Sequence, residues 1–209
     1  MPLFTIDRGQ LHYSEEESDM LALKALLCSL FYPGMQWIRS FWDESDGTTR
    51  CFYVASSAGD IEYHAGVVGV PCLVIRLVTE VRANASGEIV VGGADPDRDH
   101  EPDDPELLTW VVRQRLDGCS DNEVACAPWR PGNGQAGWLR TFIDREADEL
   151  FSVFREYSCE RVQRLAEECG FATIEVRQMN QALPADVAAA NGLSLSPYGA
   201  ARAASPSTA

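Results

Sequence analysis

The chain has 209 residues, of which 45% are hydrophobic and 23% charged, a composition typical of a folded protein with one or two domains. Its formal net charge of −15 excludes sequence-independent nucleic-acid binding, because a phosphate backbone would repel it. No stretch approaches the ~20 consecutive apolar residues of a membrane span, and residues 1–10 lack the pattern of a signal peptide. We therefore expect a cytoplasmic protein without a nucleic-acid or membrane partner.

The first part of the chain predicts the element order β-α-β-β-α-β. Ser14 followed by Glu17 has the pattern of a capping box at a helix start, and Asp46-Gly47 predicts a tight hairpin turn. The predicted elements in chain order are a strand at 3–7, a helix between Ser14 and Pro33, strands at 35–42 and 50–55, a helix at 58–68 and a strand at 72–81.

The second part predicts the same order less cleanly. We expect a strand at 88–91, a helix at 104–118, strands at 138–143 and 149–154, a helix at 159–169 and a strand at 171–179. Residues 94–106 are predicted to form an acidic linker, because His100 replaces the glycine that a calcium loop of this spacing requires. Residues 119–134 are predicted to be a long loop that covers or shapes a site, and the Ala-, Ser- and Pro-rich tail at 183–209 to be mostly disordered, with one helical turn near Val187.

The two parts resemble each other at an offset of about 101 residues. The segment Trp37-Ile38-Arg39-Ser40-Phe41 matches Trp138-Leu139-Arg140-Thr141-Phe142, and the later helices match with Leu165 in the place of His64. Cys51 aligns with Leu150 if the second hairpin turn is shorter. We therefore predict an α+β fold of two tandem ferredoxin-like (βαββαβ) repeats at 1–85 and 86–182.

Each predicted sheet has one apolar face without helices, which needs a cover. Packing of the two sheets against each other provides that cover and produces an intramolecular dimeric α+β barrel. The protein is then a monomer that behaves as a pseudo-dimer, or a homodimer.

Four short patterns in the first repeat resemble a family of short bacterial ferredoxin-like proteins of unknown function, one member of which is described as nickel-binding. The patterns are Trp37-Ile38-x-Ser40, Cys51-x-Tyr53-x-Ala55, Ile61-x-x-His64-Ala65 and Gly69-x-Pro71, and the resemblance covers about residues 4–81. It implies the fold, pairing through the sheets, and binding of a small molecule or of a divalent transition metal such as nickel. The family's surface metal sites use histidines near the start of the chain, where this sequence has only His12.

His64 lies on the apolar side of the predicted helix at 58–68, so its imidazole is expected to point toward the sheet. Cys51 and Tyr53 share one face of their strand, and an imidazole, a thiol and a phenol together can supply a general base with a nucleophile or acid. His64, Tyr53 and Cys51 are therefore candidate catalytic residues, and His64 and Cys51 candidate metal ligands. The alternative is a structural core histidine bonded to the tyrosine or to a carbonyl. A half-buried His64 would titrate near neutral pH.

Trp37, Arg39 and Trp42 are candidate ligand-binding residues, because a strand arginine beside tryptophans can hold an anion. The same arginine could instead form an ion pair. The main hypothesis is a small-ligand or nickel-type metal-binding protein with a single site in the first repeat. The alternative is a cofactor-independent enzyme of secondary metabolism, of the cyclase, isomerase or oxygenase type, with an apolar pocket under the helix at 58–68. The sequence leaves open which of these applies, and a protein-interaction module has no specific signal.

Overall fold

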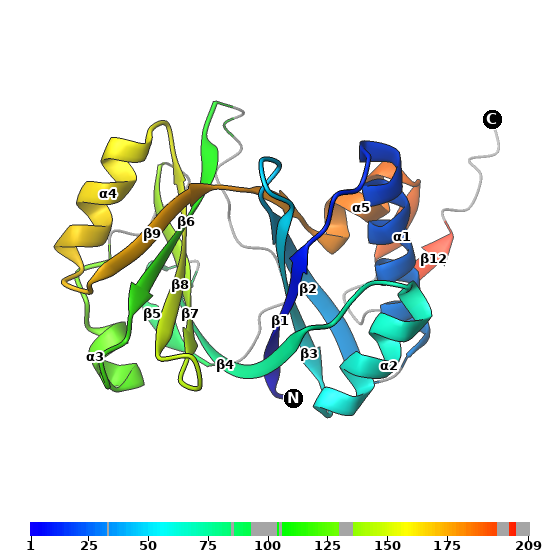
Figure 1. The fold of residues 1–209 in the computed structure, drawn as a ribbon, viewed down its shortest axis with the longest axis horizontal. Helices are drawn as coiled ribbons and strands as arrows, with labels where there is room; N and C mark the ends of the chain where they lie inside the picture. The colour runs from blue at the N-terminus through cyan, green and yellow to red at the C-terminus, as the bar shows by residue number, and fades with distance from the viewer. Residues whose placement is uncertain are drawn as a thin grey trace. The chain divides into compact units, whose positions relative to one another are not determined.

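The computed structural model describes residues 1–32, 34–84, 86–92, 104, 106–129, 136–195 and 201–203. The chain forms two compact units, and we call residues 1–75 with 181–209 unit 1 and residues 76–180 unit 2 (Figure 1). Both units combine an antiparallel sheet with a few helices, so the fold class is α+β. Among the described residues, no helix is long and apolar enough to cross a bilayer.

The main sheet of unit 1 has the strand order β10-β2-β3-β1-β4. Its elements are β1 (Leu3–Gln10), α1 (Glu15–Phe31), β2 (Met35–Trp42), β3 (Thr48–Ala55), α2 (Ala58–Val68), the start of β4 (Val74–Ala83) and the end of β10 (Asn180–Ala182). Both α1 and α2 cover the same face of this sheet (Figure 1). The order β2-β3-β1-β4 is that of a βαββαβ sheet.

Local signals set these boundaries. The Ser14 hydroxyl accepts from the backbone N–H of Glu17, whose carboxylate accepts from the Ser14 N–H, so the predicted capping box starts α1. The β2–β3 turn contains Gly47 at φ 73°, where a Cβ would lie 2.5 Å from the Leu11 carbonyl oxygen. A side chain at that position would clash with backbone, so this turn requires glycine.

Unit 2 contains the remainder of β4, together with β6 (Leu108–Arg115), β7 (Gly137–Asp144), β8 (Glu149–Glu156) and β9 (Thr173–Gln178), in the order β4-β7-β8-β6-β9. A short strand, β5 (Ile89–Val91), pairs with β4. The helices are α3 (Asp121–Ala125) and α4 (Cys159–Glu168). The strands β7-β8-β6-β9 thus have the same relative order as β2-β3-β1-β4.

The predicted helix at 104–118 is wrong, since residues 108–115 form β6, paired with both β8 and β9. The segment Thr109-Trp110-Val111-Val112 consists of β-branched and aromatic residues, which fit a pleated sheet between two neighbours better than a helix. The strand predicted at 88–91 exists as β5, but it lies beside β4 and does not begin the βαββαβ order.

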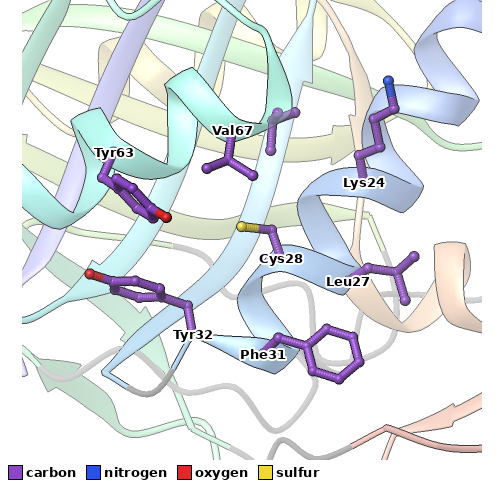
Figure 2. A pocket seen from close by; sticks show the side chains of 8 residues that line it. Lys24, Leu27, Cys28, Phe31, Tyr32, Tyr63 and Val67 are labelled. Carbon is purple, nitrogen blue, oxygen red and sulfur yellow. The ribbon is translucent and has the colours of Figure 1, made fainter.

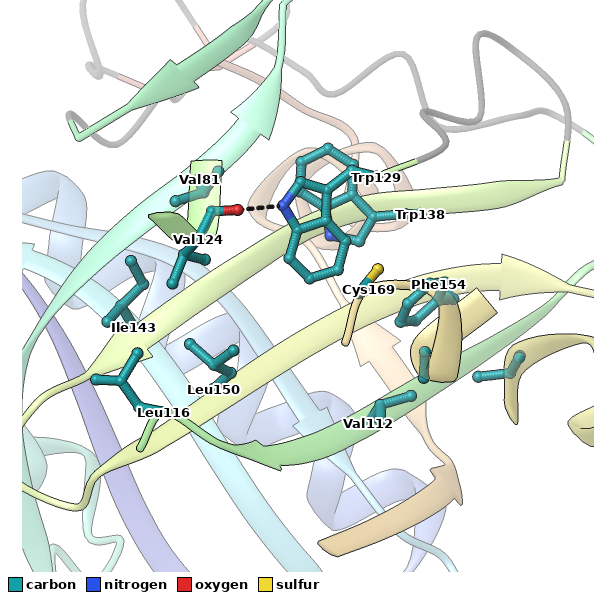
Figure 3. Close-up of a cluster of buried hydrophobic side chains, with 12 residues drawn as sticks. Val81, Val112, Leu116, Val124, Trp129, Trp138, Ile143, Leu150, Phe154 and Cys169 are labelled. Atoms are coloured by element: carbon teal, nitrogen blue, oxygen red, sulfur yellow. Dashed lines mark hydrogen bonds between the residues drawn. The ribbon is translucent and has the colours of Figure 1, made fainter. Parts of the chain in front are cut away.

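The described part of the predicted loop at 119–134, residues 119–129, packs into the core of unit 2. Its first part forms α3, and the ring of Trp129 stacks on Trp138 with centroids 4.8 Å apart (Figure 3). The Trp129 Nε1 donates to the Val124 carbonyl at 2.7 Å, so this buried ring is also held by α3. Residues 130–134, like most of the predicted acidic linker at 94–106, lie outside the described residues.

The prediction of a mostly disordered tail is wrong for residues 184–195. They form α5 (Pro184–Ala190) and β11 (Leu193–Leu195), which pairs with β12 (Ala201–Ala203). The helix α5 packs beside α1 (Figure 1), and Ala188 is buried in the same apolar cluster as Ala25 and Leu26. The helical turn predicted near Val187 is part of α5, and burial against α1 stabilises the longer segment that composition alone does not predict. Residues 196–200 and 204–209 lie outside the described part of the chain.

Candidate functional site

A cluster of polar side chains is buried in unit 1 between the sheet and its helices. We call it the Arg8 cluster and define it as Arg8, Ser40, Cys51, Tyr53 and His64. The strand register places Ser40 opposite Cys51 and Trp37 opposite Tyr53. Because directly paired residues project from the same face of a sheet, these four side chains share the face that α2 covers.

Hydrogen bonds connect the cluster into a continuous chain. The Trp37 Nε1 donates to the Ser40 Oγ at 3.1 Å, and this hydroxyl donates to the Cys51 Sγ at 2.9 Å. The Arg8 Nε donates to the same sulfur at 3.1 Å, and the Arg8 Nη1 donates to the Pro71 carbonyl at 2.9 Å. The Cys51 sulfur therefore accepts from two donors, one of which is a guanidinium.

Arg8 is only 4% exposed, yet no carboxylate pairs with it among the described residues. Burial lowers the pKa of Arg8, but Cys51, Tyr53 and Cys72 outweigh this effect, so the pKa is raised and the group stays charged. A buried cation without an anionic partner is costly. It is compensated fully only when a negative charge forms or binds beside it.

Sequence analysis missed Arg8, although a signal was present. Phe4, Ile6 and Arg8 alternate along β1 and therefore share one face of the strand. An arginine on the apolar face of an alternating strand is unusual and marks a position for inspection.

His64 is 1% exposed, and its ring centroid lies 5.1 Å from that of Tyr53. Neither imidazole nitrogen has a hydrogen bond of ordinary geometry within the described residues. Burial lowers the pKa of His64 to about 4, with the backbone of Ala25 opposing the shift and the charge of Arg8 adding to it. The condition for titration near neutral pH, a half-buried ring, is therefore not met, because the ring is enclosed and burial keeps the imidazole uncharged at pH 7.

Tyr53 is also uncharged, because burial raises the pKa of its phenol, an effect that Arg8 only partly opposes. The phenol is 1% exposed and can act as a hydrogen-bond donor toward a group that enters the cluster. The site thus combines one fixed cation with a thiol, a phenol and a neutral imidazole.

The three predicted ligand-binding residues separate in the structure. A β-bulge between Trp37 and Arg39 changes the alternation, so Trp37 lies on the helix-covered face and Arg39, paired with Phe52, on the other face. Trp42 is half-buried opposite Thr49 at the end of β2. Only Trp37 therefore contacts the Arg8 cluster through a hydrogen bond, by way of Ser40.

The described residues hold no group of three or more His, Cys, Asp or Glu side chains that could bind a metal ion. The predicted pair of metal ligands, His64 and Cys51, therefore lacks a third protein ligand in the part of the chain that the structure describes. The Arg8 guanidinium donates a hydrogen bond to the Cys51 sulfur and so competes with a metal cation for that atom.

An open groove of ≈ 450 Å³ lies between α1 and α2 on the outer side of unit 1 (Figure 2). It is lined by Lys24, Leu27, Cys28, Phe31, Tyr32, Tyr63, Val67 and Val68. His64 is not among these residues, so the groove is not the predicted pocket under α2. Cys28 nevertheless lies close enough to Tyr53 to contribute to the raised pKa of the phenol.

Unit 2 has an uncharged counterpart of the Arg8 cluster. Thr141 pairs with Ser152 as Ser40 pairs with Cys51, which makes Ser152, and not Leu150, the counterpart of Cys51. The predicted alignment of Cys51 with Leu150 is therefore wrong. Both hairpins have a β-bulge after the tryptophan of their first strand and the same strand register, so the second hairpin turn is not shorter than the first. Ile6 pairs with Cys51 as Val112 pairs with Ser152, so the counterpart of Arg8, two residues further along the strand, is the neutral Gln114.

Hydrogen bonds also connect this counterpart. The Trp138 Nε1 donates to the Thr141 Oγ1 at 3.0 Å, and this hydroxyl lies 2.8 Å from the Ser152 Oγ. The Ser152 hydroxyl reaches the Gln114 Oε1 at 3.4 Å. The Gln114 Nε2 donates to the carbonyls of Ala166 and Phe171 at 3.2 and 3.4 Å, so every polar side chain of this chain of bonds has a partner.

No family model and no curated protein matches the chain. The chain resembles a candidate monooxygenase from Lactobacillus acidophilus NCFM at 11% identity, with 88% of this chain and 96% of that chain covered and a TM-score of 0.43. It resembles a candidate chlorite dismutase at 10% identity, with 90% of this chain and 98% of that chain covered and a TM-score of 0.44. It also resembles an anthrone oxidase-like protein at 13% identity, with 85% of this chain and 93% of that chain covered and a TM-score of 0.41. These TM-scores are too low to transfer a function, so the site is interpreted from its own residues.

Proposed function

We propose that the chain is a small-molecule enzyme of the cofactor-independent type, with its working site at the Arg8 cluster of unit 1. The observation that carries this proposal is the buried charge of Arg8, which faces a thiol and a phenol but no carboxylate of the described residues. Unit 2 has a neutral glutamine at the equivalent position, so the fold itself does not require the charge. The proposal includes two tandem ferredoxin-like repeats packed through their sheets as a dimeric α+β barrel.

The chemistry that suits this site is an isomerisation or cyclisation through an anionic intermediate. A buried guanidinium stabilises negative charge that develops on a substrate oxygen, and it does so more strongly than in water because the surroundings are dry. In this mechanism Cys51 supplies the nucleophile or base, held in place by Ser40. Tyr53 donates its phenolic proton in a hydrogen bond to the substrate, and the neutral His64 ring donates or accepts one further bond.

Thermal-shift screening of small molecules on matched variants tests this proposal. Unit 2 supplies the replacement residues, which give Arg8→Gln, Cys51→Ser, Tyr53→Phe and His64→Leu. A ligand at 100 times its Kd should stabilise the wild-type protein by about 2.7 kcal/mol. The same ligand should have no effect on Arg8→Gln, whereas the control Ser152→Cys in unit 2 should respond as the wild type does. Equal responses of the wild-type protein and Arg8→Gln would contradict the proposal.

Binding without turnover is a second candidate function, favoured by the low basicity of His64, whose pKa of about 4 makes it a weak proton acceptor at neutral pH. A ligand that shifts the melting temperature but leaves the protein unchanged after long incubation would support this candidate. Nickel, cobalt or zinc added in the same assay tests the metal binding that the family resemblance implies. A stoichiometric shift lost in both His64→Leu and Cys51→Ser would support a metal site there.

A further inference from the structure

The groove between α1 and α2 combines exposed apolar side chains with a single cation. Phe31, Tyr63 and Val67 are 83%, 60% and 57% exposed, although large hydrophobic residues of this kind are usually covered. Their clustering around one groove, seen in Figure 2, marks a binding surface more than scattered exposure would. The volume of ≈ 450 Å³ lies in the range of small-molecule sites.

The two ends of the groove carry opposite charges. Lys24 lies at one end, and the Tyr32–Tyr63 ring pair, with centroids 5.6 Å apart, lies at the other (Figure 2). The Tyr32 hydroxyl donates to the Asp60 Oδ1 at 3.1 Å, which places a carboxylate behind the tyrosine end. A ligand with one negative group is therefore oriented with that group toward Lys24.

Lys24 is the only lysine among 17 basic residues, and within the described residues it forms no ion pair. Its ammonium group is exposed beside apolar surface and available to a ligand. In a chain with a net charge of −15, a second copy of the same protein is a poor partner for this groove, because the two surfaces repel each other.

We infer that the groove binds a small apolar monocarboxylate, with its carboxylate at Lys24 and its apolar body along Phe31, Val67 and Tyr63. This inference goes beyond the proposed function and does not depend on the Arg8 cluster. Burial of the apolar body supplies most of the affinity, and the contact with Lys24 sets the orientation and the preference for an anion.

Titration calorimetry with matched probes tests the inference. At low salt, 1-naphthoate should bind about 3- to 5-fold more tightly than naphthalene-1-methanol, the range of an exposed ion pair. Lys24→Gln should abolish this preference, whereas the control Arg164→Gln, which removes an exposed charge from α4, should preserve it. Val67→Ser should weaken both probes. A preference for 1-naphthoate that survives in Lys24→Gln would overturn the inference.

Decanoate and 1-decanol form a second pair of probes that identifies the apolar body. Tighter binding of decanoate than of 1-decanol, abolished in Lys24→Gln, supports an aliphatic carboxylate as the ligand. Tighter binding of 1-naphthoate than of naphthalene-1-methanol, abolished in the same variant, supports an aromatic one. If neither carboxylate binds more tightly than its matched alcohol, the inference is overturned.

The single lysine permits an independent readout. Trinitrobenzenesulfonate labels amino groups and also reacts with thiols, so labelling is measured by mass spectrometry at Lys24, the only lysine, and at the Met1 α-amino group. Bound 1-naphthoate should slow labelling of Lys24 in proportion to occupancy and leave Met1 as an internal reference. An unchanged rate at Lys24 under saturating naphthoate would overturn the inference.

The Arg8→Gln variant separates this inference from the proposed function. If the groove is the site, naphthoate should bind Arg8→Gln as tightly as it binds the wild-type protein. Binding lost in Arg8→Gln but retained in Lys24→Gln would place the ligand at the Arg8 cluster, which overturns the groove site and supports the proposed function.

Discussion

The polar interiors of the two units are built on the same plan but carry different charges. In each unit a tryptophan on the second strand of the βαββαβ order donates to a hydroxyl, and that hydroxyl contacts the residue opposite on the next strand. In unit 2 the bonds continue to Gln114, and all groups are neutral and paired. In unit 1 they continue through a thiol to Arg8, beside a histidine whose ring nitrogens make no hydrogen bond of ordinary geometry in the described part of the chain.

This difference separates what the fold requires from what it merely tolerates. Unit 2 demonstrates that an amide, a hydroxyl and leucine satisfy the same positions. At those positions unit 1 keeps a buried cation that pairs with no carboxylate among the described residues, and a buried imidazole without a hydrogen bond of ordinary geometry there, and both features reduce stability. Destabilising polar groups that the fold does not need are characteristic of working sites.

Introduction into unit 2 of the arginine found in unit 1 should have the largest effect on the unfolding free energy. Gln114→Arg places a guanidinium where Ser152 and two carbonyls already satisfy an amide, so the protein should lose about 3–5 kcal/mol of unfolding free energy. Urea denaturation measures this loss. A loss below about 1 kcal/mol would indicate that both interiors accommodate a cation equally.

Acid should destabilise unit 1 through His64. Its pKa is lowered from 6.5 to about 4, so between these values the unfolded chain binds a proton that the folded chain does not. The contribution of His64 to the unfolding free energy is fully present above about pH 6.5, and it falls by about 3 kcal/mol as the pH drops to 4. Urea melts at several pH values should show this slope in the wild-type protein. His64→Leu should lack it, because leucine does not titrate, and identical slopes would contradict the predicted burial.

The N-caps of α2 and α4 should differ in a smaller way. The Ser57 hydroxyl accepts from the Asp60 N–H, whereas Ser158 makes no such side-chain bond. Ser57→Ala should therefore cost about 1 kcal/mol, and Ser158→Ala should have little effect on the melting temperature. Equal costs for the two substitutions would refute this distinction.

Replacement of Arg8 should have the smallest effect on stability. Arg8→Gln removes a buried charge along with its bond to Cys51, and the new amide can donate to the Pro71 carbonyl as Gln114 donates to Phe171. These opposing changes should leave the unfolding free energy within about 1 kcal/mol of the wild-type value. A loss of several kcal/mol in urea melts would identify Arg8 as a structural residue.

Much of the fold was predictable where signals are local. The capping box at Ser14, the turn at Gly47 and the helix at 58–68 follow from short-range steric and hydrogen-bond preferences that the sequence states directly. The burial of His64 follows equally from its place on the apolar side of that helix.

Only the tertiary structure decided the features that depend on distant partners. Residues 108–115 became a strand because β8 and β9 lie on either side of them, and α5 formed because α1 offers an apolar surface. The sequence by itself determined which side chains face the interior where the element was predicted correctly and is regular, as for His64 on α2. It did not determine that Arg8 meets a thiol 43 residues away, because strand pairing and register bring together residues between which no local preference acts.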